Sequence, residues 1–340
     1  METSILRTAD LFDALKPEWN ALLHASMADT PFLTHEWQCT WWACLCEGEL
    51  FVITVRDGGA LVGLAPLFIL SQPGQDGQMR RLLRLIGSVD ASDYLDLIAV
   101  RGREREVFDA MLDVLAQSAE WDVLDLYNVP AGSPTRSILP ALEAERGWTF
   151  TDEQQVVCPI ITLPTAFEDY VQSLDKKERH ELRRKLRRGE GTEGLTWCAI
   201  TGDDHSHDLD AAAEAFIDLM MKSRSDKSDF MTDRMRRFFH QMIHATHAGG
   251  FLHLSFLEVQ GVKAATYLSF DYGQKRLVFN SGLETTGFQS LSAGIVLVAR
   301  MIEDAIKRGY TEFDFLRGDE EYKYRLGAKD TWIYHVAVER

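Results

Sequence analysis

Ionisable side chains crowd one short stretch near the C-terminus, which reads FDFLRGDEEYKYRLG from Phe313 to Gly327. The alternation of apolar and acidic residues at its start predicts a strand, and Arg317 with Gly318 predicts a turn after it. Four residues around this turn could do chemistry: Asp314, Glu320, Tyr322 and Lys323. A carboxylate could accept a proton, a phenol could donate one, and an ammonium could stabilise negative charge. This set suits group transfer to an amine or a hydroxyl, whereas a solvated charged turn is the alternative interpretation.

A long helix must position this stretch, because the sequence predicts a strand and then a long helix before it, and the stretch itself begins with a second strand. The strand Arg276–Ser281 leads through a loop rich in Gly, Ser and Thr to a helix expected over Ser292–Arg308. Small residues at 290–294 let backbone N–H groups approach a ligand, and a helix N-terminus favours anions. The start of this helix therefore suits a pyrophosphate, although Ser292 could also be an ordinary N-cap.

Basic residues fill a second predicted helix, in the stretch LDKKERHELRRKLRRGEG from Leu174 to Gly191. Leu182 and Leu186 give it a thin apolar stripe at a spacing of four residues. Arg183 and Arg184 lie among the basic positions and are candidates for contact with a phosphorylated or polyanionic ligand. A solvated basic helix is the other interpretation.

Acidic residues beside a tyrosine mark one further candidate site for substrate binding, in the N-terminal half of the chain. Asp93 and Tyr94 precede an apolar run, and we expect them to line a cleft that binds substrate. An ordinary acidic loop would give the same pattern. The histidines and cysteines show no spacing typical of metal ligands, so we expect no metal.

Length and composition bound the class of protein. The chain has 340 residues, 46% of them hydrophobic, and a formal net charge of −16. This acidic balance argues against a DNA-binding protein. No apolar run is long enough for a transmembrane helix, and the N-terminus lacks a signal-peptide pattern, so we expect a cytoplasmic protein.

The order of predicted elements repeats between the two halves of the chain. Each half reads as helices, antiparallel strands, a long helix and further strands, which predicts an α/β (α+β) fold with mixed sheets. Each sheet is expected to be mostly antiparallel with one β-α-β crossover and flanking helices. We therefore predict two domains, at residues 1–160 and 161–340.

Several of these segments resemble the acetyltransferases of the CelD-like, cellulose-biosynthesis type within the GNAT superfamily, which are relatives of the Fem-type aminoacyl transferases. The matching segments are KKERHELRRKLRR, FLHLSFLEVQGVKAATYLSF, SLSAG and FDFLRGDEEYKYRLGA in the C-terminal half, with THEWQCTWW and SDYLD in the N-terminal half. The resemblance covers nearly the whole chain. It implies two tandem GNAT-like domains, the second of which holds an acyl donor between splayed strands.

The resemblance also implies an acyl-CoA co-substrate, whose pyrophosphate rests on a loop of pattern Q/R-x-x-G-x-G/A. The equivalent residues here are Gln289, Ser290, Leu291, Ser292, Ala293 and Gly294. Ser292 replaces the first glycine of the pattern, a departure that leaves room for an aminoacyl-tRNA donor. Backbone N–H groups of Phe279, Asn280 and Ser281 would hold the oxyanion, and Tyr322 would protonate the leaving thiolate.

Three hypotheses follow from these observations. The leading one is an acyl-CoA-dependent N-acyltransferase acting on an amine of a small molecule, a sugar or an envelope precursor. In it Asp314 or Glu320 assists deprotonation, Lys323 binds charge on the acceptor or donor, and Arg317 contacts substrate. The second is Fem-like transfer from aminoacyl-tRNA, with the basic helix as the tRNA contact. The third is a non-catalytic binding module on the same fold.

Overall fold

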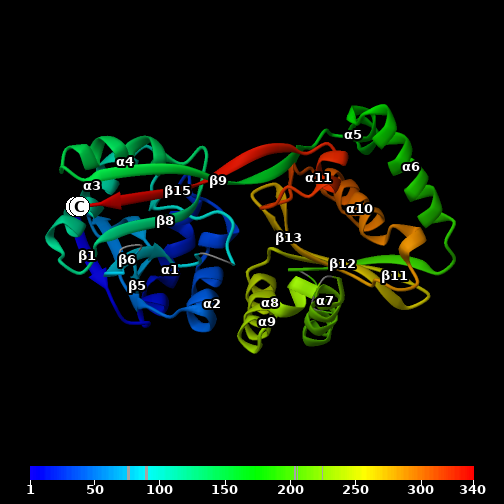
Figure 1. The fold of residues 1–340 in the computed structure, drawn as a ribbon, viewed down its shortest axis with the longest axis horizontal. Coiled ribbons are helices and arrows are strands. Elements are labelled where there is room, and N and C mark those ends of the chain that lie inside the picture. Colours follow the sequence, from blue (N-terminus) through cyan, green and yellow to red (C-terminus); the bar gives the residue numbers. More distant parts are fainter. Residues whose placement is uncertain (75–76, 89–90, 203, 205, 224) are drawn as a thin grey trace. The chain divides into compact units, whose positions relative to one another are not determined.

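The computed structural model describes residues 1–340 except 75–76, 89–90, 203, 205 and 224 (Figure 1). It divides the chain into two compact units. The N-terminal unit contains residues 1–156 and 332–340, and the C-terminal unit contains residues 157–331. The predicted domain border at residue 160 lies close to the passage from the N-terminal to the C-terminal unit after residue 156, but the last nine residues belong with the N-terminal unit. The reason is long-range pairing, since β15 (Lys329–Glu339) forms an antiparallel ladder with β8 (Val123–Pro130).

Two sheets form the N-terminal unit. One has the strand order β1-β3-β4-β7, and the other contains β15-β8-β6-β5-β2. In the second sheet β6 and β8 are parallel, and α3 lies between them in the chain, which makes a β-α-β crossover. The elements are β1 (Glu2–Leu6), α1 (Leu11–His24), α2 (His35–Leu45), β2 (Glu49–Leu50), β3 (Val52–Asp57), β4 (Ala60–Ala65), β5 (Leu67–Pro73), β6 (Met79–Leu85), β7 (Ile98–Ala99), α3 (Glu104–Gln117), β8 and α4 (Pro134–Ala144).

The C-terminal unit is built on strands in the order β10-β11-β12-β13-β14-β9. Neighbours from β10 to β13 are antiparallel, β13 and β14 are parallel, and β9 (Thr149–Thr162) pairs antiparallel with β14. The remaining elements are α5 (Phe167–Ser173), α6 (Lys176–Glu190), β10 (Leu195–Thr201), α7 (Leu209–Ser223), α8 (Ser225–Phe230), α9 (Asp233–Ala248), β11 (Leu252–Val259), β12 (Val262–Tyr272), β13 (Lys275–Leu283), α10 (Ala293–Lys307), β14 (Glu312–Asp314) and α11 (Glu321–Arg325). The predicted mixed sheet with one crossover in each half is confirmed.

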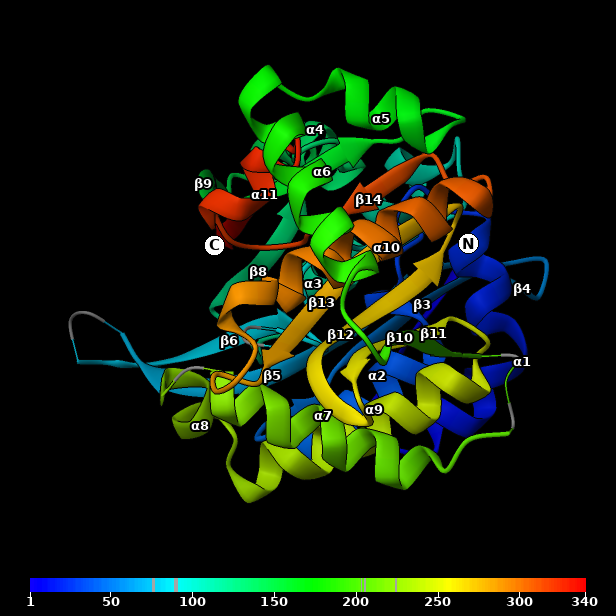
Figure 2. The same ribbon diagram turned by 90° about the vertical axis from the view of Figure 1, so that its right-hand side faces the viewer.

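Helices cover both faces of the C-terminal sheet. Figures 1 and 2 show α5, α6 and α10 on one face and α7, α8 and α9 on the other. The sequence of α10, AGIVLVARMIEDAIK, is apolar on most of its surface, so this helix lies buried between the sheet and α6. Leu182 and Leu186 of α6 belong to the same core, which anchors the otherwise basic helix.

Candidate active site

The strands β13 and β14 run side by side for a short distance only. Their parallel ladder covers Lys275–Leu277 on β13 and Glu312–Asp314 on β14. On its other edge β13 pairs with β12 as far as Leu283, and a register shift between Leu268 and Ser269 of β12 leaves one extra residue, Phe279, on β13. β14 stops early because the chain turns at Leu316, whose φ of 54° is left-handed. The C-terminal half of β13 therefore has no recorded parallel partner within the described residues.

The N-terminus of α10 lies on this side of the sheet. A single 3-10 turn, Gln289–Leu291, precedes this helix. Ser292, between the turn and the helix, adopts a left-handed φ of 55°, which sets the direction in which the helix begins. Ser292 makes no side-chain cap hydrogen bond, so it is not a conventional N-cap. No acceptor among the described residues is recorded for the backbone N–H groups of Ala293 and Gly294. These two donors and the helix dipole suit an anion.

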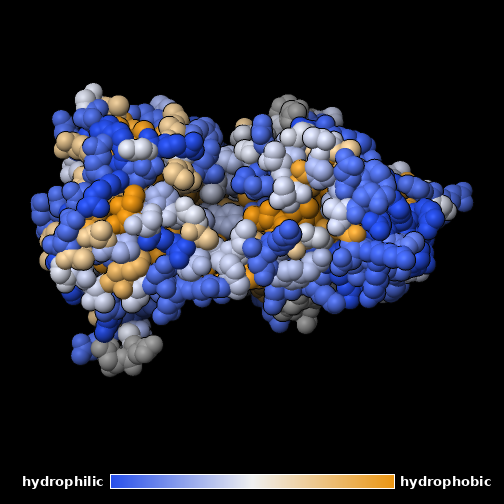
Figure 3. All heavy atoms as spheres, turned by 90° about the horizontal axis from the view of Figure 1, so that it is seen from above, coloured by the Kyte–Doolittle hydropathy of each residue, from blue (hydrophilic) through white to orange (hydrophobic). Residues whose placement is uncertain are grey.

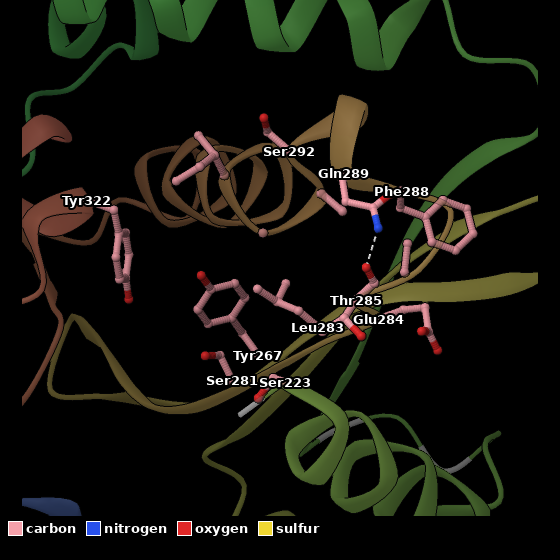
Figure 4. A pocket seen from close by; sticks show the side chains of 14 residues that line it. Ser223, Tyr267, Ser281, Leu283, Glu284, Thr285, Phe288, Gln289, Ser292 and Tyr322 are labelled. Atoms are coloured by element: carbon pink, nitrogen blue, oxygen red, sulfur yellow. Dashed lines mark hydrogen bonds between the residues drawn. The ribbon is translucent and has the colours of Figure 1, made fainter. Parts of the chain in front are cut away.

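A pocket of about 480 Å³ opens between the end of β13 and the start of α10. Figure 4 shows Tyr322 on one side of it and the turn with Phe288, Gln289 and Ser292 on the other. On the face shown in Figure 3, hydrophobic atoms of the C-terminal unit appear between hydrophilic ones. The lining residues come from α7, β12, β13, α10 and α11: Ser223, Ala264, Tyr267, Ser281, Leu283, Glu284, Thr285, Phe288, Gln289, Ser292, Ala293, Gly294, Ile295 and Tyr322.

Glycine at position 294 keeps this pocket open. A Cβ atom placed there would come within 3.0 Å of the Leu283 Cδ2 atom and 3.7 Å of the Tyr267 hydroxyl. A methyl group at position 294 would press against the end of the Leu283 side chain, so glycine leaves the backbone at the start of α10 open toward the pocket. The Gln289 side-chain amide donates to the Thr285 carbonyl and braces the preceding loop (Figure 4).

Two phenols meet in the pocket. The hydroxyl groups of Tyr267, on β12, and Tyr322, on α11, point toward the same space (Figure 4). Burial raises the pKa of Tyr267 to about 12, and the neighbouring Tyr322 hydroxyl opposes that shift. Burial also raises the pKa of Tyr322, with further contributions from Tyr267 and from the negative charge of Glu320. Both phenols are therefore protonated at neutral pH, and Tyr322 can act as a proton donor.

The other members of the ionisable cluster hold the loop after β14. Asp314 is 2% exposed, and its Oδ1 atom accepts a hydrogen bond of 2.7 Å from the Leu316 backbone N–H. Lys323 is 3% exposed, and its Nζ atom donates to the carbonyls of Phe315, Arg317 and Gly318 at 3.3, 3.0 and 3.0 Å. These bonds stabilise the left-handed turn at Leu316.

Glu320 joins this loop to the phenols. Its Oε2 atom forms an ion pair of 2.9 Å with the Lys323 Nζ atom, while its side chain keeps an exposed fraction of 48%. Its charge also contributes to the raised pKa values of Tyr267 and Tyr322. Of the two acidic groups Asp314 and Glu320, Glu320 is thus the one that is exposed to solvent. Its negative charge also acts on the two phenols of the pocket.

The segment predicted to hold an oxyanion lies at the edge of the pocket. Ser281 lines the pocket, and its backbone N–H donates to the Asn280 Oδ1 atom at 2.8 Å. Lys227 of α8 donates from Nζ to the same Oδ1 atom at 2.9 Å and to the Ser281 carbonyl at 2.6 Å. The Phe279 ring packs against Phe239 and Phe270. Of these three residues, Ser281 is the one that the pocket exposes.

The predicted anion contacts on α6 have intramolecular partners. Arg183 forms an ion pair with Glu168, and Arg184 forms one with Glu181 at 2.7 Å. Arg188 donates to the Ser290 carbonyl in the turn before α10. The basic helix is therefore tied directly to the loop at the pocket mouth.

Asp93 and Tyr94 belong to the N-terminal unit and are 5% and 9% exposed. The Tyr94 carbonyl accepts a hydrogen bond from Thr30, and its ring packs edge-on against Phe32. These contacts place both residues in the interior of that unit, and their role in substrate binding stays a prediction.

Two classes of feature are not found in the described part of the chain. No group of three or more His, Cys, Asp or Glu side chains there could hold a metal ion. None of the helices described there combines the length and hydropathy that a membrane crossing needs.

The structure brings together part of the predicted site and adds members to it. One pocket is lined by Tyr322, Ser281, Gln289, Ser292, Ala293 and Gly294. Arg317 and Glu320 lie in the loop between β14 and α11, and Asp314 at the end of β14 and Lys323 in α11 bond to that loop. Ser290 and Leu291 belong to the turn that carries Gln289. Sequence analysis missed Tyr267 and Lys227. A lone phenol within the apolar run AATYLSF was the available signal for Tyr267, and no local signal marked Lys227.

Comparison with known proteins agrees with this geometry. Residues 176–324 match the family model described as acetyltransferase (GNAT) domain. No curated protein matches the chain. A crystal structure of FemX aligns over 98% of this chain and 97% of its own, with 13% identity and a TM-score of 0.67. The C-terminal domain of a putative lysylphosphatidylglycerol synthetase from Agrobacterium fabrum covers 97% and 92%, with 10% identity and a TM-score of 0.57.

A tandem GNAT protein from the clavulanic acid biosynthesis pathway aligns over 99% of this chain and 98% of its own, with 14% identity and a TM-score of 0.50. Identities this low establish the fold alone. Residues 176–324 thus carry the match to the acetyltransferase (GNAT) domain, and the chain as a whole has the fold of tandem GNAT proteins.

Proposed function

We propose that the protein transfers an acyl group from acyl-CoA to an amine of a small molecule or a sugar-linked precursor. The observation that carries this proposal is the pocket in the C-terminal unit, which has a protonated phenol at one side and two backbone donors at the other. The resemblance of FDFLRGDEEYKYRLGA to CelD-like acetyltransferases agrees with it.

The residues at the start of α10 fit the pyrophosphate of coenzyme A. Ala293 and Gly294 offer N–H donors, and the absence of a Cβ atom at Gly294 lets a phosphate approach them. Ser292 stands where the GNAT pattern has glycine, yet it adopts the left-handed conformation that glycine would supply. The carboxylate of Glu284 also lines the pocket, and its ion pair of 3.2 Å with Lys222 offsets the repulsion of a phosphate.

The chemistry assigned to the side chains follows from their surroundings. The amine nitrogen attacks the thioester carbonyl carbon, the C–S bond breaks, and the amine proton passes through water to a base. Glu320 is the better base, because Asp314 is buried and already accepts the Leu316 N–H bond. Tyr322 gives its phenol proton to the departing sulfur and regains a proton afterwards, as its raised pKa requires. Lys323 positions the loop that leads into α11, the helix that carries Tyr322.

The backbone of Phe279–Ser281 would stabilise the negative charge on the carbonyl oxygen. In the structure the Ser281 N–H is bonded to the Asn280 side chain, so it becomes available only if that side chain turns away. Lys227 holds the same Asn280 oxygen, and we propose that it positions this segment.

Transfer from aminoacyl-tRNA is a second candidate, favoured by the likeness to FemX and by the basic surface of α6. A thermal-shift screen with acyl-CoAs and with tRNA separates the two. Acyl-CoA should raise the melting temperature in the first case. In the second case tRNA should bind in a salt-sensitive manner that weakens when Arg183, Arg184 and Arg187 become Glu. A non-catalytic module would retain its biological activity in Tyr322→Phe, which removes the proposed proton donor and keeps the ring.

A further inference from the structure

Two hydrogen-bond donors converge on one carbonyl oxygen at the wall of the pocket. The oxygen is the Oδ1 atom of the Asn280 side chain on β13. It accepts a bond of 2.8 Å from the Ser281 backbone N–H and a bond of 2.9 Å from the Lys227 Nζ atom. Two donors at such distances from one oxygen are the arrangement that stabilises an oxyanion in acyl transfer. Here the arrangement holds an amide oxygen of the protein itself.

The two donors lie where the sheet opens toward the pocket. Ser281 lines the pocket beside Tyr267, its cross-strand partner on β12 (Figure 4). The parallel ladder between β13 and β14 ends at Leu277, so no parallel partner is recorded for Ser281 in the described part of the chain. The carbonyl of a thioester that enters the pocket at this strand would therefore lie next to both donors.

Close packing of α7 against β13 brings Lys227 to this place. A Cβ atom at Gly282 would come within 2.5 Å of two backbone atoms of α7, so glycine permits the close approach of this helix to the strand. The next helix in the chain, α8, carries Lys227. Its Nζ atom also donates to the Ser281 carbonyl at 2.6 Å, a bond that does not involve Asn280. The ammonium therefore keeps a contact with the strand when the Asn280 side chain turns away.

Resting on the acyl-transfer function proposed above, we propose that Lys227 is a catalytic residue whose ammonium, together with the Ser281 N–H, binds the thioester carbonyl oxygen at the position of the Asn280 oxygen. When the amine nitrogen attacks the carbonyl carbon, the electron pair of the C=O π bond moves to this oxygen. The pair returns when the C–S bond breaks and the sulfur leaves with the proton of Tyr322. Between these events the oxygen is negatively charged, and a cationic donor stabilises it more than a neutral donor does.

Asn280 acts as an internal competitor in this arrangement. Its amide oxygen and a thioester oxygen cannot occupy the same two donors at once, so the acyl donor exchanges one carbonyl for another. In the unmodified protein this exchange gives little net free energy to the bound thioester. Removal of the amide leaves both donors to the substrate, so Asn280→Ala should tighten the binding of a carbonyl and of nothing else.

The test compares two ligands that differ only at this carbonyl, acetyl-CoA and its thioether analogue S-ethyl-CoA, by isothermal titration calorimetry. The unmodified protein should bind both with affinities within about threefold of each other. Asn280→Ala should bind acetyl-CoA about tenfold more tightly than S-ethyl-CoA. Adding Lys227→Met to this variant should lower the ratio to about threefold, because only the Ser281 N–H remains. Adding Lys307→Met instead removes an exposed charge outside the pocket and should keep the ratio at about tenfold.

Infrared difference spectroscopy with acetyl-CoA labelled at the carbonyl carbon gives a readout that a merely structural role would not move. Hydrogen bonds from both donors should lower the stretching frequency of the bound carbonyl, and the lowering should be smaller in Lys227→Met. This single variant keeps Asn280, so it tests the proposal even if Asn280→Ala does not fold. Binding of S-ethyl-CoA shows in every variant that the pocket is intact.

The outcomes separate this inference from the proposed function. Failure of both ligands to bind the unmodified protein would overturn the proposed function, and the inference with it. If both ligands bind, an unchanged carbonyl frequency in Lys227→Met would overturn the inference while the acyl-CoA function stands. The same holds for a tenfold ratio in Asn280→Ala that persists after Lys227→Met is added. Mass spectrometry that found the acyl group attached to Lys227 would make this residue a nucleophile and would also overturn the inference.

Discussion

Replacing Lys323 with methionine tests the structural role that its contacts assign to it. Lys323 is 3% exposed, and its ammonium donates to three carbonyls and pairs with Glu320 at 2.9 Å. Methionine matches the length of the side chain but leaves these carbonyls without their donor. Hydrogen bonds to charged groups contribute about 1.5–3 kcal/mol each and do not add fully, so Lys323→Met should lower the free energy of unfolding by about 3–5 kcal/mol.

Urea denaturation measures this loss, and hydrogen exchange over residues 313–327 locates it. We expect faster exchange in that segment and little change in the rest of the C-terminal unit. Lys329→Met removes an exposed lysine from the start of β15 and should leave stability nearly unchanged. A loss of less than about 1 kcal/mol for Lys323→Met, with unaltered exchange, would refute the positioning role.

Two further predictions concern the proton donor and a buried acid. Tyr322→Phe should reduce kcat about 100-fold or more, measured as thiol release from acetyl-CoA with a panel of amines, while the Kd for acetyl-CoA stays unchanged. Tyr324→Phe, an exposed change on the same helix, should leave kcat intact, and equal rates in all three proteins would exclude Tyr322 as the acid. Glu143 in the N-terminal unit is fully buried, and no hydrogen-bond partner is recorded among the described residues for either of its carboxylate oxygens. Burial raises its pKa to about 8. The folded state therefore holds a proton that the unfolded chain releases near pH 4.5, so stability should fall as pH rises from about 4.5 to about 8. Glu143→Gln should remove that slope and stabilise the protein by about 3 kcal/mol at pH 7, and a urea series from about pH 5 to 9 that showed the same slope in both proteins would contradict this.

Local patterns in the sequence were sufficient to predict the elements that frame the site. The helix expected over Ser292–Arg308 is α10 at Ala293–Lys307, because a continuous apolar surface and Gly309 at its end define it. The basic helix predicted within Leu174–Gly191 is α6, anchored by the Leu182 and Leu186 stripe that the periodicity indicated. The crossover from β13 through α10 to β14 then fixed where the C-terminal cluster lies.

Contacts between segments far apart in the chain could not be predicted from local sequence patterns. The strand predicted at the start of the stretch Phe313–Gly327 ends at Asp314, because Asp314 and Lys323 stabilise a left-handed turn at Leu316. No sequence pattern reveals that a lysine is buried against three carbonyls. β15 pairs with β8, which lies some two hundred residues earlier in the chain. Because of this pairing, most of the last strand belongs to the N-terminal unit and not to the expected C-terminal domain. Tyr267 reaches the pocket through the pairing of β12 with β13, at its cross-strand partner Ser281.

Titration of the protein with acetyl-CoA by isothermal calorimetry tests the central claim most directly, with Ser292→Asp as the matched variant. Ser292 lines the pocket and is partly exposed, and aspartate tolerates the left-handed φ of 55° at this position. The added carboxylate would lie beside the Ala293 and Gly294 N–H groups and repel a pyrophosphate. We predict that acetyl-CoA binds the unmodified protein and that Ser292→Asp weakens this binding by about 100-fold without unfolding the protein. Absence of binding to the unmodified protein, or equal binding by a folded Ser292→Asp variant, would contradict the account.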